Sequence, residues 1–163
     1  MDPSITAGWD NFFVAEVGAS AALTGLVFVA VSINVSRILA FPHLPGRAAH
    51  TLLLFFWVLL ISSFGLVPGQ SARLLGAEIL GVAILGIVSA SWVQFRHRLD
   101  VQERSWVISQ VLTSQVPLVP FVVCAVLLLK NRPEGLYWLV GGTVSSFAAG
   151  VLNAWVLLVE ILR

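Results

Sequence analysis

Five long runs of apolar residues, separated by short polar breaks, make up almost the whole chain. A helix needs about 20 mostly apolar residues to cross a bilayer, so we predict spans over 12–36, 48–67, 74–95, 106–129 and 136–162. The first run starts with acidic and small residues and could be partly re-entrant, which would leave four full spans. The pattern predicts an all-α, polytopic membrane protein: one helical domain, 1–163, with no soluble domain.

Proline and glycine mark three of the four breaks between these runs. The break at 96–105 lacks both, and its charges Arg96, Asp100 and Arg104 are spaced four residues apart. This spacing predicts that the helix extends into the cytosol. Within the fourth run, Pro117 and Pro120 predict a kink, because proline removes a helical hydrogen bond.

Composition supports the membrane interpretation. Hydrophobic residues make up 58% of the chain and charged residues only 10%, whereas soluble domains carry about 25% charged residues. The expected surroundings are therefore a lipid bilayer. The net charge of +1 provides no general basic field for nucleic acid, which we do not expect as a partner.

The arginines and lysines in the breaks predict the orientation. Arg37, Arg47, Arg96, Arg98, Arg104 and Arg163 fall on one side, against Arg73, Lys130 and Arg132 on the other. Because cytoplasmic loops are enriched in basic residues, we expect a multi-pass protein of the cell membrane with its N-terminus outside and its C-terminus in the cytosol.

Few residues could carry enzymatic chemistry. A thiol relay needs two cysteines, and the chain has only Cys124. His43, His50 and His97 lie in or beside breaks, where His43 and His50 could bind a metal or simply be loop histidines. The only lysine, Lys130, ends a helix, and every aspartate lies outside the spans. We therefore expect no enzyme, no cofactor and no metal centre.

The polar residues inside the spans are the candidate functional groups. Ionisable side chains are costly in a membrane and tend to mark function or to pair. Glu16 and Glu78 lie at similar depth near the outer surface, with Arg73 about one turn above Glu78 as a predicted partner. The two glutamates suggest a small carrier, or else they only reach toward the interface. In the last span, Asn153 is expected to hydrogen-bond across a helix interface.

The first span has the clearest pattern. Steps of three and four residues define one helical stripe, which consists of Glu16, Ser20, Leu23, Val27, Ala30, Asn34 and Arg37. Roughly opposite lie the small residues Gly18, Ala22 and Gly25, which would let another helix approach closely. Gly142 and Ser146 form a similar small face in the last span. A polar stripe with a close-packing back suits a pore-lining helix, but also a dry bundle.

Several segments carry a resemblance. The stretch 13–34, followed by Leu44-Pro45-Gly46-Arg47-Ala48 and Val67-Pro68-Gly69-Gln70, resembles a family of small, uncharacterised bacterial membrane proteins over about the first half of the chain. The run 22–31 also resembles the pore helix of calcium-release-activated calcium channels. That family has its selecting glutamate at the C-terminal end of the helix, where this chain has Asn34.

Three functions follow as hypotheses. The first is a homo-oligomeric channel for ions, in which the first span lines the axis of a ring, because one stripe cannot enclose a water path alone. The second is a non-conducting regulatory or assembly subunit of a larger membrane complex. The third is a small carrier that uses Glu16 and Glu78.

Overall fold

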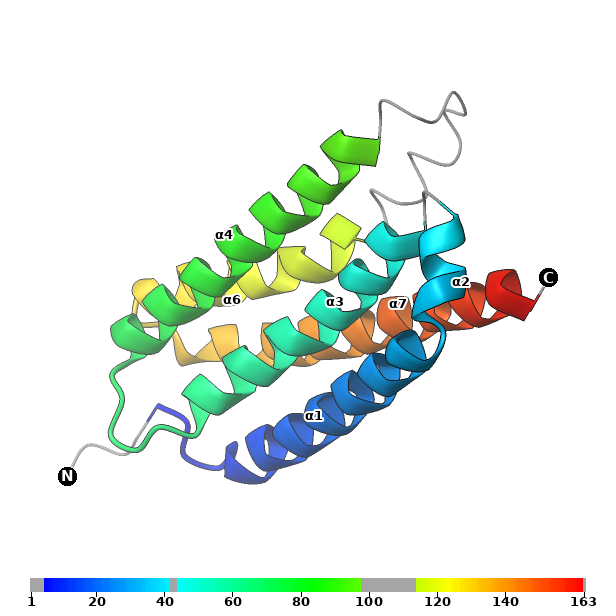
Figure 1. Ribbon diagram of the computed structural model, residues 1–163. Coiled ribbons are helices and arrows are strands. Elements are labelled where there is room, and N and C mark those ends of the chain that lie inside the picture. Colours follow the sequence, from blue (N-terminus) through cyan, green and yellow to red (C-terminus); the bar gives the residue numbers. More distant parts are fainter. Residues whose placement is uncertain (1–4, 42–43, 98–113, 163) are drawn as a thin grey trace.

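The computed structural model of the protein describes residues 5–41, 44–97 and 114–162. It is a bundle of helices, and the described residues include no strand, so the all-α prediction is confirmed. In chain order the elements are α1 (Asp10–Ile33), α2 (Val35–Ala40), α3 (Leu44–Gly65), α4 (Ala72–His97), the 3₁₀ turn η1 (Val116–Leu118), α6 (Val119–Leu129), the 3₁₀ turn η2 (Pro133–Leu136) and α7 (Tyr137–Leu162) (Figure 1).

Four helices are long and apolar enough to cross a membrane. They cover Asp10–Ile33, Leu44–Gly65, Ala72–Trp92 and Pro133–Glu160. The first is continuous over 24 residues, which is not the form of a re-entrant segment. The predicted fourth span is represented by the shorter apolar helix Val116–Leu129, and its start, 106–113, lies outside the described residues. Most of the predicted cytosolic extension, 98–105, does so as well.

Two boundaries differ from the prediction for local reasons. The first helix breaks at Asn34, whose side-chain amide donates a 2.9 Å hydrogen bond to the carbonyl of Ala30 and so competes with the helical backbone. The third helix begins at Leu44 and includes Pro45, which the sequence placed in a polar break. Proline fits the first turn of a helix, where its missing N–H would have no partner.

The helix type changes at the place in the fourth span where a kink was predicted. Ser114 and Gln115 are helical, the 3₁₀ turn η1 contains Pro117, and α6 then begins with Pro120 at its second position. Proline is tolerated at both places because a first helical turn leaves its N–H groups unpaired in any case.

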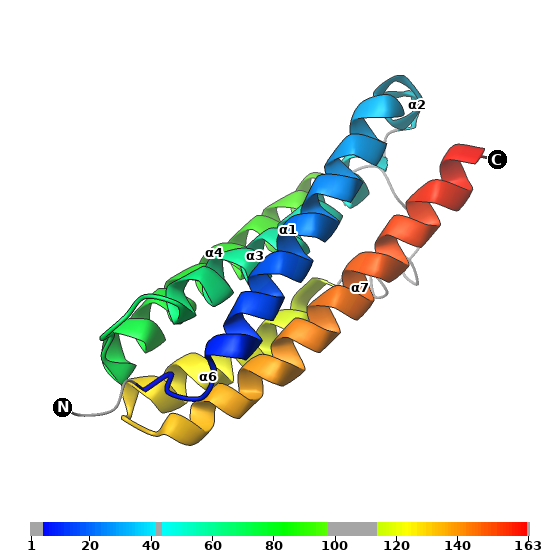
Figure 2. The ribbon, with the colours of Figure 1, turned by 90° about the horizontal axis from the view of Figure 1, so that it is seen from below.

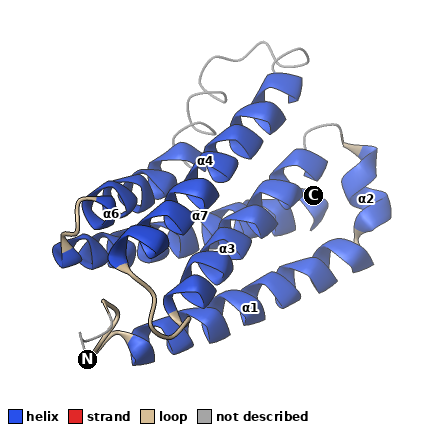
Figure 3. Ribbon diagram, turned by 90° about the vertical axis from the view of Figure 1, so that its left-hand side faces the viewer, coloured by secondary structure: helices blue, strands red, loops and turns tan. Residues whose placement is uncertain are grey.

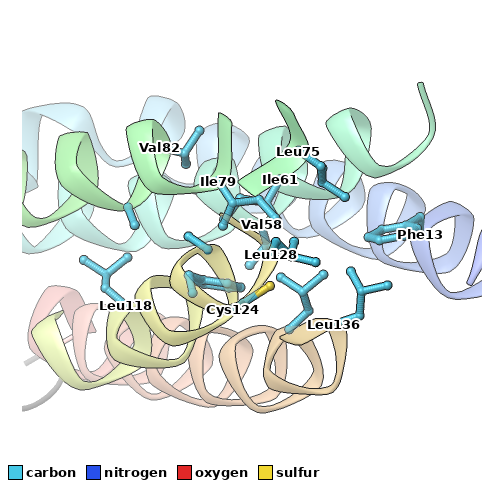
Figure 4. Packing of buried hydrophobic residues seen from close by; sticks show 14 residues of the cluster. Phe13, Val58, Ile61, Leu75, Ile79, Val82, Leu118, Cys124, Leu128 and Leu136 are labelled. Atoms are coloured by element: carbon cyan, nitrogen blue, oxygen red, sulfur yellow. The ribbon is translucent and has the colours of Figure 1, made fainter. Parts of the chain in front are cut away.

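Helix α3 lies at the centre of the bundle and packs against α1, α4 and α7. Helix α6 packs against both α4 and α7, and α1 lies at the edge with α3 between it and α4 (Figures 1 and 3). The main core cluster joins α3, α4, α6 and α7, and Phe13 is its contribution from α1 (Figure 4).

Three helix pairs are fitted together by a phenylalanine ring that lies over a glycine. Phe13 of α1 covers Gly65 of α3, Phe121 of α6 covers Gly142 of α7, and Phe55 of α3 covers Gly150 of α7. In each pair, a methyl group added to the glycine would overlap the ring. The three rings are almost fully buried. These contacts allow the backbones to approach closely, as small residues do in membrane bundles.

Candidate functional site

Helix α1 packs along α3, and its aromatic contacts with the rest of the bundle are at its N-terminal end. There Phe13 enters the core, and the ring of Trp9 contacts those of Phe12 and Tyr137 edge-on, with centroids 5.5 and 5.2 Å apart. Along its apolar length only 6% of positions are buried, against 39–50% in the other three long helices. Most of the surface of α1 is therefore turned outward, toward whatever surrounds the protein.

The predicted polar stripe of α1 is turned toward the bundle. Ser20 is fully buried, and its hydroxyl donates to the backbone carbonyls of Glu16 (2.5 Å) and Val17 (3.2 Å). Glu16, Leu23, Val27 and Asn34 are partly buried, whereas Ala30 and Arg37 are exposed. The Ser20 hydroxyl is satisfied within its own helix, and the inward placement of Glu16 shields part of its carboxyl from lipid.

The small residues of α1 occupy the outward face. Gly18, Ala22 and Gly25 are all exposed. A Cβ built on Gly18 or Gly25 would meet nothing within 4 Å. This face was expected to pack closely against another helix, but no helix in the described part of the chain covers these three positions. The protein thus presents a narrow, smooth strip on its outer surface.

The two glutamates sit on different sides of α3. Glu16 belongs to α1 and Glu78 to α4, and both helices pack against α3, which lies between them (Figure 1). Gln70 donates a 2.5 Å hydrogen bond from Nε2 to Oε2 of Glu78. The partner that the structure gives Glu78 is thus Gln70, from the turn before α4, whereas Arg73, the predicted partner, has an exposed side chain.

The small face of α7 lies inside the bundle. Gly142 receives the ring of Phe121, and Ser146 is buried at 1% exposure. Asn153 is also buried, at 8% exposure. The faces of α1 and α7 therefore look alike in sequence but have opposite placements, inward on α7 and outward on α1.

Some contacts gave no clear signal in the sequence. Gly150 lies under Phe55, and Arg47 of α3 lies 3.6 Å from Glu160 of α7. Helical periodicity defines which residues share a face, but it does not tell which residue of another helix faces them. Gln70 could have been found from its place in the Pro-Gly turn before α4, where a side chain can reach the first turns of the helix.

The faces of α1 and α7 described above are suited to contacts between helices. Among the described residues, no three His, Cys, Asp or Glu side chains lie together so as to hold a metal ion. The outward strip of α1 consists of Gly18, Ala22 and Gly25, and these three residues offer neither a charge nor a hydrogen-bonding side chain. The chain matches no family model, no curated protein and no solved structure.

Proposed function

We propose that this protein is a non-conducting, self-associating membrane subunit, which assembles with other transmembrane helices through the outward strip of α1, defined by Gly18, Ala22 and Gly25. Four helices of membrane-spanning length and composition support its place in a bilayer. From the loop charges we further propose a cell membrane location with the N-terminus outside, and from the resemblance a bacterial one.

The outward strip of α1 carries this proposal. In lipid there is no hydrophobic force to bring helices together, so association depends on close backbone approach over small residues. An exposed strip of two glycines and an alanine provides such a surface, and no other helix of the described chain uses it.

The channel hypothesis has less support from this arrangement. In a ring with α1 on the axis, the surface facing the axis would be the outward one, made of small and apolar residues. Ser20, expected to line the pore, is fully buried within the protomer. Water in a pore would thus meet Gly18, Ala22 and Gly25 rather than the polar stripe, so we favour a dry contact between helices.

The carrier hypothesis is also weaker. A carrier would use Glu16 and Glu78 together at one substrate site, but α3 lies between the two helices that hold them. Glu78 is already hydrogen-bonded to Gln70. Each glutamate therefore has its own surroundings.

Self-association tests the proposal directly. Donor- and acceptor-labelled copies are mixed in vesicles, and energy transfer is followed as added lipid dilutes the protein. Gly25→Leu should weaken association about tenfold, since overpacking a close contact costs about 1–3 kcal/mol. Gly81→Leu is the matched control, because Gly81 of α4 is also exposed with open space around it. Equal dilution curves for the two variants would contradict the proposed interface.

Ion flux separates the subunit from the channel. Liposomes containing the wild type should keep a salt gradient, and so should liposomes containing Val27→Ser. In a channel lined by the stripe, the added hydroxyl would wet the apolar middle and raise the leak. Flux that increases in Val27→Ser would favour the channel and end the non-conducting proposal.

A further inference from the structure

Three polar side chains outside the outward strip lie at one level between α1, α3 and α7. They are Glu16 of α1, Ser62 of α3 and Thr143 of α7. Ser62 and Thr143 are each 1% exposed, and Glu16 is partly buried. Their common level follows from the ring contacts between the helices and from the helix directions. Helices α1 and α7 run in the same direction, and α3 runs opposite to both (Figures 1 and 2).

Ser62 faces Thr143 where α3 packs against α7. The ring of Phe55 covers Gly150 in this contact. Ser62 follows Phe55 by seven residues, and Thr143 precedes Gly150 by seven. Seven residues are about two helical turns, so each side chain lies on the contact face of its helix, about 10 Å from the ring contact. Because the two helices are antiparallel, both displacements lead to the same level.

Glu16 reaches this level from α1. The ring of Phe13 covers Gly65 of α3. Glu16 lies three residues after Phe13, and Ser62 lies three residues before Gly65. Each is displaced by about 4.5 Å along its helix, and the displacements have the same direction because α1 and α3 are antiparallel. Glu16 and Ser62 are therefore level with each other.

The contact between α1 and α7 gives the same result independently. The rings of Trp9 and Tyr137 are 5.2 Å apart. Glu16 follows Trp9 by seven residues, and Thr143 follows Tyr137 by six. Since these two helices run in the same direction, the levels of Glu16 and Thr143 differ by about one residue, or about 1.5 Å. Three separate contacts thus place the three side chains together.

We infer that Glu16, Ser62 and Thr143 bind one small monovalent cation, Na⁺. Oε2 of Glu16 and Oγ of Ser62 are buried and have no hydrogen-bond partner. The hydroxyl of Thr143 donates to the carbonyl of Val140 at 3.1 Å, and its oxygen can still bind a cation through a lone pair. Hard cations take such oxygen ligands. Glu16 is partly exposed, so water can complete the coordination.

The charge of the three side chains favours a monovalent ion. An unpaired carboxylate is costly inside a membrane, and the carboxyl of Glu16 forms no ion pair with any described residue. One Na⁺ balances this single negative charge, whereas a divalent ion would leave an excess positive charge. The described residues likewise hold no cluster of acidic, histidine and cysteine side chains of the kind that binds divalent metals.

Stability in sodium salts tests the site. Thermal unfolding of the purified protein in micelles is compared in sodium chloride and choline chloride at equal ionic strength. Na⁺ should raise the Tm until the site is saturated, because a ligand stabilises the state that binds it. Glu16→Gln should abolish this shift. The matched control Glu78→Gln should keep it, because Glu78 is bonded to Gln70 on the other side of α3. Equal Tm values of the wild type in both salts, or the same loss in both variants, would overturn the inference.

The hydroxyl ligands are tested by direct binding of radioactive sodium, for which we expect one ion per protomer. Thr143→Val keeps the shape of the side chain and should lower the affinity about tenfold, whereas Thr143→Ser should bind like the wild type. Ser62→Ala should also weaken binding and replaces Glu16→Gln if that variant does not fold. Gly25→Leu should keep Na⁺ binding while it weakens self-association, so the inference fails separately from the proposed function. Unchanged affinity in both Thr143→Val and Ser62→Ala would show that these side chains form no sodium site.

Discussion

The contact between Phe13 and Gly65 should control how α1 is held to the bundle. Gly65 is the last residue of α3, and a Cβ added there would lie 2.5 Å from Cδ1 and 2.6 Å from Cζ of Phe13. The ring cannot easily move aside, because it is fully buried in the core cluster. Gly65→Ala should therefore push α1 away from α3 at the point where α1 buries its largest side chain.

The expected cost can be worked out from this overlap. Overpacking of a well-packed core costs about 1–3 kcal/mol. The usual gain of alanine over glycine, about 1 kcal/mol in a helix interior, is smaller at the last residue of a helix. We therefore expect Gly65→Ala to lower the free energy of unfolding by about 1–2 kcal/mol. Phe13→Ala should cost more, about 3–5 kcal/mol, because it removes a buried ring.

The double variant gives the sharper result. Once Phe13→Ala has removed the ring, Gly65→Ala meets no clash and should cost little. The two changes should therefore be non-additive by about 1–2 kcal/mol, within the range seen for residues in contact. Unfolding by added dodecyl sulfate in mixed micelles, followed by circular dichroism, would measure all three variants.

Gly81→Ala is the control for this series. Gly81 lies in α4 with nothing within 4 Å of an added Cβ, so alanine there should be neutral or stabilising by up to about 1 kcal/mol. If Gly65→Ala behaved like Gly81→Ala, or if its cost were unchanged by Phe13→Ala, the argument from the ring overlap would be refuted.

Two more predictions concern the ends of the bundle. Gln70→Leu should lower the free energy of unfolding by about 1–3 kcal/mol, because it leaves the carboxyl of Glu78 without its donor. If the free energy of unfolding, measured in micelles, fell by less than about 0.5 kcal/mol, the hydrogen bond would contribute little to stability and the prediction would be contradicted. In a cysteine-free background, Ser71→Cys and Glu134→Cys should react with a membrane-impermeant thiol reagent from outside intact cells, and Ser36→Cys only after lysis. Labelling of all three from outside would contradict the orientation.

The helices were predictable because each apolar run has about the length of a membrane span. The predicted span 74–95 corresponds to α4, Ala72–His97, and the predicted span 136–162 corresponds to α7, Tyr137–Leu162. Errors arose where one residue type has two roles. Pro45 was interpreted as part of a break, although proline also suits the first turn of a helix, where α3 has it.

Which face of α1 points inward could not be predicted from hydrophobicity. In a soluble protein the apolar side of a helix is the buried side, but in lipid both sides of a helix are apolar. The stripe through Glu16 and Ser20 was recognised from its spacing, yet its direction depends on how α1 meets α3. Similarly, Gly65 and Gly142 gave no indication of which ring they receive, because that depends on the register between two helices.

The arrangement of α1 beside α3 has a consequence for biosynthesis. The two helices are neighbours in the chain, joined through the short α2, and they pack against each other over much of their length. Phe13 meets Gly65 at the open end of this hairpin, so their contact can close only after the last residue of α3 has entered the membrane. Local contacts form first during synthesis. The first helical hairpin can therefore be complete before α4 has entered the membrane, and the remaining helices would then pack onto α3.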